Sequence, residues 1–182
     1  MTFSSRIPER ATILFLDLGT STGWAVGRVG EAPPLCGTWV FDRRCDGWGD
    51  QLAGVADTVW EAIKHHQVDI LGYETVVNVD KRGWDSTMTL IGFAAVVEML
   101  AFRAGIMLNT RHLSAIRSRF VRRTKGVKGT KDSPGIEIKD VVMGEAIKRG
   151  CVIDSHNAAD ACAGWYFEEQ QTLLTVAGYR KR

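Results

Sequence analysis

Three apolar runs joined by very short loops constrain the fold of this chain more than any other feature. They cover residues 11–18, 22–29 and 35–41, are rich in β-branched and aromatic side chains, and are separated by glycine and proline. Strands joined by so few residues have to run antiparallel, because a parallel connection needs a crossover of a dozen residues or more. The chain is therefore predicted to begin with three antiparallel strands.

The pattern then changes to alternating helices and strands. The predicted order is helix 49–66, strand 69–75, helix 86–104, strand 106–111 and helices 113–122, 137–148 and 158–171. Strands reached by helical crossovers run parallel. We therefore predict an α/β fold with a five-stranded mixed sheet, three antiparallel strands then two parallel, and helices on both faces.

Length and composition indicate one soluble domain. The 182 residues are 45% apolar and 24% charged, and no window approaches the ~18 unbroken apolar residues of a membrane helix. We divide the chain into an N-terminal tail (1–10), a domain (11–175) and a basic C-terminal tail (176–182). The start does not resemble a signal peptide. A cytoplasmic protein, of a bacterial cell or a phage, or one from a reducing organelle, is expected.

The four cysteines follow neither a CxxC pattern nor a zinc-binding spacing, and are expected to be reduced thiols. The helix predicted at 86–104 is apolar nearly all round, so both of its sides should be buried. In a protein this small, a second copy of the chain is the expected cover for one side, which predicts a homodimer.

Three acidic side chains occupy unusual positions. Asp17 and Glu74 end apolar strands, and Asp160 lies in the first turn of the last helix, three residues after Asn157. If the two strands are parallel neighbours, both acids lie at the sheet edge where open α/β sheets bind ligands. Each acid alone is better explained as a solvated turn residue or a partner of the helix dipole. The functional hypothesis therefore rests on the set.

Converging carboxylates repel one another unless a cation joins them, and Mg²⁺ prefers oxygen ligands. Two such ions can activate a water and stabilise the leaving oxygen of a phosphodiester. The set therefore predicts Mg²⁺ as cofactor, with one or two ions per subunit, and hydrolysis by metal-activated water.

A basic segment supports a nucleic-acid partner. Between residues 111 and 131 there are eight Lys or Arg and no acid. Seven of them are predicted to contact a phosphate backbone: Arg117, Arg119, Arg122, Arg123, Lys125, Lys128 and Lys131. A solvated surface that aids solubility is the alternative interpretation.

The turn after the first strand reads Asp17-Leu18-Gly19-Thr20-Ser21 and has two interpretations. In one, Thr20 and Ser21 offer hydroxyls and amides to a DNA phosphate. In the other, the turn is the phosphate loop of an actin-like ATPase. That fold needs a second such loop, and this chain has one.

The blocks LFLDLGTSTGWAV, DILGYETVV and IKDVV…HNAADACA resemble the RuvC-type Holliday-junction resolvases of the ribonuclease H-like superfamily. The resemblance runs from about residue 11 to 168. It implies a ribonuclease H-like fold and a homodimeric endodeoxyribonuclease that uses Mg²⁺ or Mn²⁺ to cut four-way DNA junctions with paired nicks. It also implies that Asp17, Glu74 and Asp160 are metal ligands and that Lys139 lies near DNA phosphate or the reaction centre.

The sequence departs from the family pattern at two places. Asn157 stands where the family has an acid, so Asn157, His156 or Asp154 completes the metal site. Val77 stands where the family often has an aromatic that presses on a junction base, and Trp84 is the candidate replacement.

Three alternatives to a junction-resolving nuclease stay open at this stage. They are a ribonuclease H-like nuclease acting on RNA, a non-catalytic junction-binding module and an ATP-binding module.

Overall fold

The computed structural model describes residues 8, 10–41, 47–75, 83–122 and 135–179. Within these ranges the chain forms one five-stranded sheet and five helices. The strands are β1 (Thr12–Asp17), β2 (Ser21–Arg28), β3 (Leu35–Val40), β4 (Ile70–Glu74) and β5 (Met107–Arg111). The helices are α1 (Trp48–His66), α2 (Trp84–Ala104), α3 (Leu113–Val121), α4 (Ile138–Lys148) and α5 (His156–Tyr179).

The strands lie in the order β3-β2-β1-β4-β5. β1 pairs antiparallel with β2, and β2 with β3, as their short connections require. β4 runs parallel to β1, and β5, which follows the α2 crossover, runs parallel to β4. The predicted α/β class, with three antiparallel strands and then two parallel ones, is confirmed.

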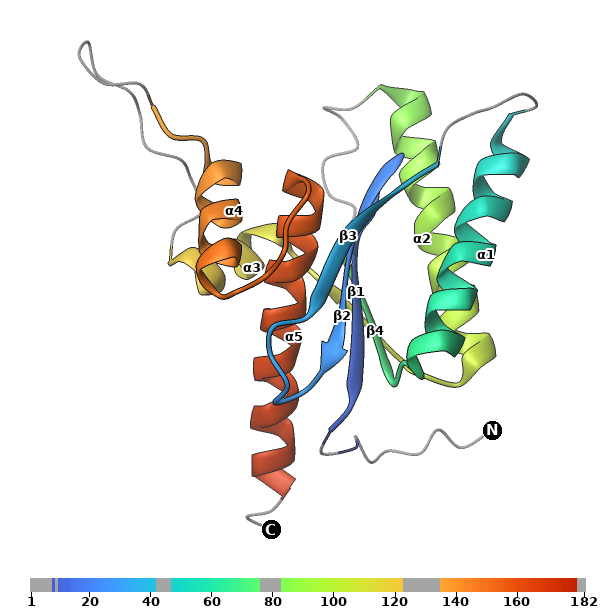
Figure 1. Cartoon of the computed structure of the whole chain (residues 1–182). Coiled ribbons are helices and arrows are strands. Elements are labelled where there is room, and N and C mark those ends of the chain that lie inside the picture. The colour runs from blue at the N-terminus through green and yellow to red at the C-terminus, as the bar shows by residue number, and fades with distance from the viewer. Residues whose placement is uncertain (1–7, 9, 42–46, 76–82, 123–134, 180–182) are drawn as a thin grey trace.

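Helices cover both faces of this sheet (Figure 1). α1 and α2 pack on one face, and α5 lies along the other with α3 and α4 against it. The central strand β1 is buried on both sides. Ile13 and Phe15 belong to the apolar cluster under α5, whereas Leu14 and Leu16 belong to the cluster under α1 and α2. Because side chains alternate along a strand, Asp17 lies on the α5 face.

The last helix is longer than the sequence predicted. α5 runs from His156 to Tyr179 rather than over 158–171, so residues 176–179 of the predicted tail are helical. The early start has a local cause: the Ser155 hydroxyl oxygen accepts the backbone N–H of Ala158 at 3.0 Å, which caps the first turn.

In a single chain only one side of the helix predicted at 86–104 is buried, and its predicted burial by a second copy stays a prediction. α2 packs on the sheet and α1, but Ile91, Met99 and Phe102 on its other side are 45%, 53% and 70% exposed. The helix also begins earlier than predicted, so that Trp84 is its first residue, 74% exposed, rather than part of a loop. By length and composition α2 matches a membrane span, yet it forms a core layer of this domain.

Two glycines let α5 pack very closely against the sheet. A Cβ on Gly23 of β2 would lie 1.9 Å from the backbone oxygen of Asn157, and one on Gly164 of α5 would lie 2.1 Å from the ring of Phe15. No real Cβ tolerates such distances, so both positions require glycine at this helix–sheet spacing. Gly23 is also the register partner of Asp17. The contact therefore sets the start of α5 beside the end of β1.

The buried carboxylate of Glu168 joins α5 to β5, an edge strand of the sheet. Glu168 is fully buried and accepts hydrogen bonds from Asn109 at 3.0 Å and from the Arg111 guanidinium, whose Nη2 lies at 3.2 Å. A buried carboxylate is tolerated only when it is paired in this way. The pairing holds α5 against β5 and, together with Gly23, fixes the helix across the sheet.

The Gly23 contact predicts a large difference between two glycine-to-alanine variants. Gly23→Ala should lower the free energy of unfolding by about 1–3 kcal/mol or more, because backbone atoms have to move apart. Gly144→Ala on α4 is the matched control. A Cβ there meets nothing within 4 Å, so alanine should stabilise by about 0.5–1 kcal/mol. Urea denaturation measures both, and equal effects would show that α5 does not depend on Gly23.

Candidate metal centre

The register of two parallel strands brings the first two acids together. Leu16 of β1 pairs with Tyr73 of β4, so Asp17 and Glu74 follow side by side. Phe15 and Gly72, two residues before each acid, lie on the α5 face of the sheet, since a Cβ on Gly72 would meet Phe15. The alternation along each strand therefore directs both carboxylates toward α5.

The third acid comes from α5. Asp160 is 5% exposed, and it lines one pocket of about 350 Å³ together with Asp17 and Glu74. The predicted convergence of the three acids is therefore present in the structure. The pocket contains eight of the predicted site residues: Asp17, Thr20, Ser21, Glu74, Arg117, Lys139, Asn157 and Asp160.

The electrostatics of the pocket show how crowded its negative charges are. Burial raises the pKa of the Asp17 carboxyl well above its ordinary value, and the charges of Asp160 and Glu74 raise it further. Lys139 acts in the opposite direction, and a hydrogen bond with Glu74 adds to the rise. The ionised form of Asp17 is therefore disfavoured unless more positive charge enters the pocket.

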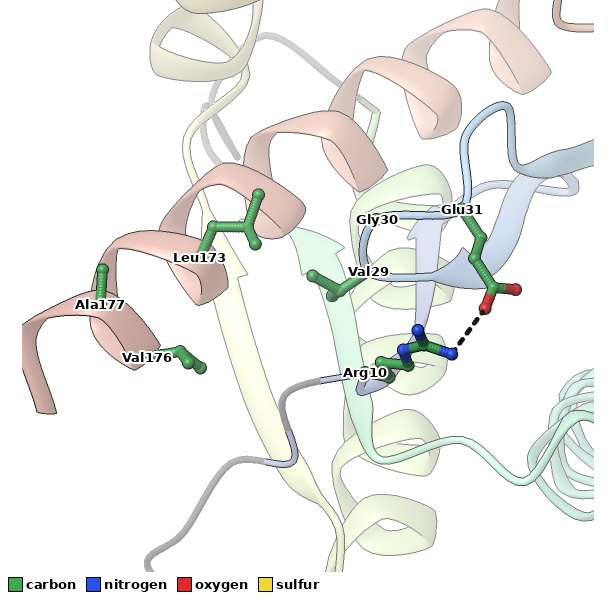
Figure 2. A pocket seen from close by; sticks show the side chains of 7 residues that line it. All are labelled: Arg10, Val29, Gly30, Glu31, Leu173, Val176 and Ala177. Atoms are coloured by element: carbon green, nitrogen blue, oxygen red, sulfur yellow. Dashed lines mark ion pairs between the residues drawn. The ribbon is translucent and has the colours of Figure 1, made fainter. Parts of the chain in front are cut away.

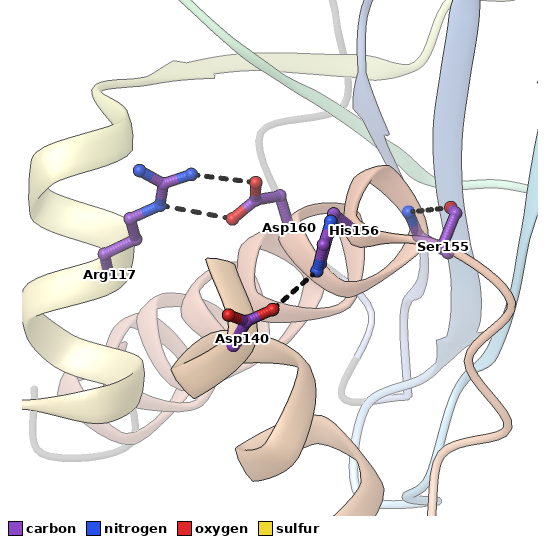
Figure 3. A network of polar contacts seen from close by, with 6 residues as sticks. Arg117, Asp140, Ser155, His156 and Asp160 are labelled. Atoms are coloured by element: carbon purple, nitrogen blue, oxygen red, sulfur yellow. Dashed lines mark hydrogen bonds and ion pairs between the residues drawn. The ribbon is translucent and has the colours of Figure 1, made fainter. Parts of the chain in front are cut away.

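Arg117 of α3 provides part of that charge, through a pairing with Asp160 that the sequence did not predict. Its Nε and Nη2 donate to the two oxygens of Asp160 at 3.2 and 2.9 Å, a bidentate pair (Figure 3). Both side chains are nearly buried, at 12% and 6% exposure. Arg117 was predicted to contact DNA, yet here it lies inside the pocket as the partner of a candidate metal ligand.

The three residues considered as a fourth ligand separate clearly. Asn157 lines the pocket, and its amide Nδ2 donates to the backbone oxygen of Ser21 at 2.6 Å, which leaves its carbonyl oxygen as the donor atom for a cation. His156 does not line the pocket, and its ring contacts Asp140 at 3.0 Å (Figure 3). Asp154 accepts a hydrogen bond from Thr38 at 3.0 Å and also lies outside the lining. Only Asn157 is therefore placed as predicted.

The remaining predicted contacts fall into two groups. Arg119 and Arg122 are exposed near the end of α3, where Arg119 donates to Gln170. Exposed Trp84 opens α2. Four cations and one aromatic position lie outside the described residues: Arg123, Lys125, Lys128, Lys131 and Val77.

The donor set fits a hard divalent cation. The pocket lining offers three carboxylates and the Asn157 carbonyl oxygen, all oxygen donors of the kind that Mg²⁺ and Mn²⁺ take. Among the described lining residues, three acids face two cations, Arg117 and Lys139, so negative charge remains. A bound cation would relieve the repulsion that raises the pKa of Asp17.

A second hollow lies at the opposite end of the sheet and lacks this chemistry. It is lined by Arg10, Val29 and Glu31 at the start of β1 and end of β2, and by the C-terminal part of α5 (Figure 2). Its single ion pair, Arg10 to Glu31 at 3.9 Å, is exposed. The acids and the glycine-rich turn belong only to the first pocket.

Sequence reasoning missed two features of the site. The role of Arg117 follows from the packing of α3 on α5, and no local motif encodes it. Leu113, the first residue of α3, also lines the pocket. No sequence signal singled out Arg117, because Arg122 and Lys128 of the same basic run also follow an apolar residue.

Solved structures share this architecture, although no family model matches the chain and no curated protein matches it in sequence. RuvC of Thermus thermophilus in complex with a Holliday junction substrate aligns with a TM-score of 0.62 at 16% identity, covering 89% of this chain and 97% of that one. The yeast mitochondrial Holliday junction resolvase Ydc2 aligns with a TM-score of 0.57 at 12% identity, covering 98% and 87%. The chain therefore has the ribonuclease H-like fold of the RuvC-type resolvases.

Proposed function

We propose that this protein is a divalent-metal-dependent endonuclease that resolves four-way DNA junctions by paired phosphodiester hydrolysis. The observation that carries the proposal is the convergence of Asp17, Glu74 and Asp160 in one pocket at the carboxyl ends of β1 and β4. The shared fold of two junction resolvases supports branched DNA as the substrate.

Asp17, Glu74 and Asp160 would hold Mg²⁺ or Mn²⁺, one or two ions per subunit, with the Asn157 carbonyl oxygen as the neutral ligand. Such ions supply the positive charge that activates water for attack on phosphorus and stabilises the departing oxygen. The Asp17 and Glu74 carboxylates would fix the position of these ions, because both side chains extend from buried strands of the sheet.

The surrounding residues position the phosphate. Thr20 and Ser21 are exposed at the pocket rim and present hydroxyls and backbone amides to a phosphodiester. Lys139, in the first turn of α4, lines the same pocket and contributes an ammonium group. Hydrolysis forms a bond from a water oxygen to phosphorus and breaks one from phosphorus to a sugar oxygen, which takes up a proton.

Arg117 changes partner in this scheme. In the structure its guanidinium occupies both oxygens of Asp160. When Asp160 serves as a ligand, the guanidinium turns toward the incoming phosphate, which is the other anion of matching bidentate geometry. This dual position reconciles the predicted DNA contact of Arg117 with the ion pair.

Symmetric cleavage of a junction needs two sites, and the exposed side of α2 suits a homodimer interface. Ile91 and Met99 lie there exposed, at 45% and 53%, on a helix whose other side is core. We propose that a second copy covers this side, in the cytoplasm or another reducing compartment.

Cleavage of a synthetic four-way junction tests the activity. Wild type with Mg²⁺ should give paired nicks, and Asp17→Asn or Glu74→Gln should lower the rate by more than about 100-fold, since loss of a partner behind a ligand already costs 10–100-fold. Asp57→Asn, an exposed acid on α1, is the control and should cleave normally. Junction binding with no cleavage at any Mg²⁺ or Mn²⁺ concentration would contradict the proposal and favour a binding module, and cleavage of RNA alone would indicate a ribonuclease.

The raised pKa of Asp17 predicts a stability effect opposite to the activity effect. Because the folded-state pKa exceeds the unfolded value, ionised Asp17 costs stability as pH rises through the folded pKa. In EDTA at neutral pH, Asp17→Asn should therefore have the higher Tm, and the difference should vanish in acid. Mg²⁺ at 100 times its Kd should stabilise wild type by about 2.7 kcal/mol and the variant by much less. Thermal unfolding with and without Mg²⁺ measures this, and equal Mg²⁺ stabilisation would place the ion elsewhere.

The dimer proposal predicts that a charge on the exposed side of α2 gives monomers. Met99→Glu should lower the mass measured by light scattering during size-exclusion chromatography from two chains to one, because the buried charge would lack a partner. Val152→Glu is the matched control, since Val152 is 87% exposed outside α2. A dimer that persists in Met99→Glu would exclude this surface as the interface.

A further inference from the structure

Three cysteines from distant parts of the chain meet on the α5 side of the sheet. Cys36 comes from β3, Cys151 follows α4, and Cys162 lies in α5. Their sulfur atoms all lie within 4.8 Å of one another, and those of Cys151 and Cys162 are 3.3 Å apart. The sequence spacing hides this cluster, because no two of its members belong to a local motif.

The sulfur spacing suits a shared cation. A metal–thiolate bond of about 2.3 Å in tetrahedral or trigonal geometry separates two sulfur ligands by about 3.8–4.0 Å. The Cys151–Cys162 separation of 3.3 Å is slightly shorter than this value and the other two are at most 4.8 Å, so small side-chain rotations bring the three sulfurs to one ion. A disulfide between Cys151 and Cys162 would use two of the three sulfurs and leave the approach of Cys36 unexplained.

The surroundings match those of a buried thiolate site. Cys151 and Cys162 are 5% and 0% exposed. The guanidinium of Arg149 and the hydroxyl of Tyr166 both lie close enough to Cys151 to act on its sulfur. Arg149 is itself held over the rings of Phe120 and Tyr166, at 4.2 and 4.9 Å. Groups of this kind, behind the ligands, orient them and offset the charge of three thiolates around a divalent ion.

Sulfur donors separate this cluster chemically from the carboxylate pocket. Thiolates favour thiophilic d¹⁰ ions such as Zn²⁺ over Mg²⁺, whereas carboxylates favour the reverse. Three protein sulfurs leave one position of a tetrahedral ion. Asp154 lies close enough to act electrostatically on Cys36, so its carboxylate or a water is available for that position.

We propose that Cys36, Cys151 and Cys162 form a zinc site that is separate from the catalytic pocket. The ion joins β3, the connection between α4 and α5, and α5 itself. It therefore fixes the first turns of α5, where Asn157 and Asp160 reside. The site is structural, and its existence does not depend on the proposed nuclease activity.

Cobalt substitution of the full chain tests the ligand set. Reduced, metal-free protein is titrated with Co²⁺ in excess Mg²⁺, and one equivalent should give a sulfur-to-cobalt charge-transfer band that Zn²⁺ abolishes. Carboxylate ligands produce no such band, so the carboxylate pocket does not contribute to this signal. Zn²⁺ should also raise the Tm, because it binds the folded chain preferentially.

Two variants and a control separate ligation from folding. Cys36→Ser, at the partly exposed member, and Cys162→Ser should each lose the band, and circular dichroism should show that Cys36→Ser stays folded. Cys45→Ser removes the fourth cysteine and should keep the band. Absence of a band in the wild type, its persistence in folded Cys36→Ser, or its loss in Cys45→Ser would each overturn the assignment.

Discussion

The close contact between α5 and the sheet is the constraint on which the rest of the structure depends. At Gly23 the backbone of β2 lies directly against the backbone of Asn157, and at Gly164 the backbone of α5 lies against Phe15. Because neither glycine carries a side chain, the helix comes close enough to the sheet for α5 to bring Asp160 to the ends of β1 and β4. A helix displaced by the width of one methyl group would leave the strand carboxylates without their third partner. The shape of the pocket is thus determined by how α5 packs on the sheet.

Placing three acids in one pocket costs stability, and the fold offsets that cost with groups drawn from other elements. Arg117 pairs with Asp160, and the charge of Lys139 acts on Asp17. Helix α5 also buries Glu168, whose negative charge is compensated by hydrogen bonds from Arg111 and Asn109. The contrast separates a structural carboxylate, which is satisfied within the protein, from a set that retains negative charge for a cation.

Much of the fold was predictable because short connections and side-chain alternation are local properties. The apolar run at 11–18 predicted a strand, and the one at 69–75 predicted a central parallel strand. If the two were parallel neighbours, Asp17 and Glu74 had to meet, and the observed register of β1 and β4 fulfils that condition. The features that were not predicted from the sequence are tertiary contacts. The Arg117–Asp160 pair and the cysteine cluster join elements that are far apart in sequence. Which side of α2 is exposed depends on which side packs against the sheet and α1, and the local sequence does not encode that choice. The start of α5 was predictable in principle, since Ser155 is a good capping residue.

The Arg117–Asp160 pair gives the protein an internal counter-ion. A guanidinium that already satisfies Asp160 competes with any incoming cation, so metal occupancy should follow the ambient divalent concentration rather than saturate at trace levels. DNA phosphates that attract the same guanidinium would weaken its competition with the cation for Asp160. Substrate and metal would then strengthen each other's binding by the same factor, as linkage requires. Under the proposed function, the chain would therefore bind little metal when free and more metal when bound to DNA.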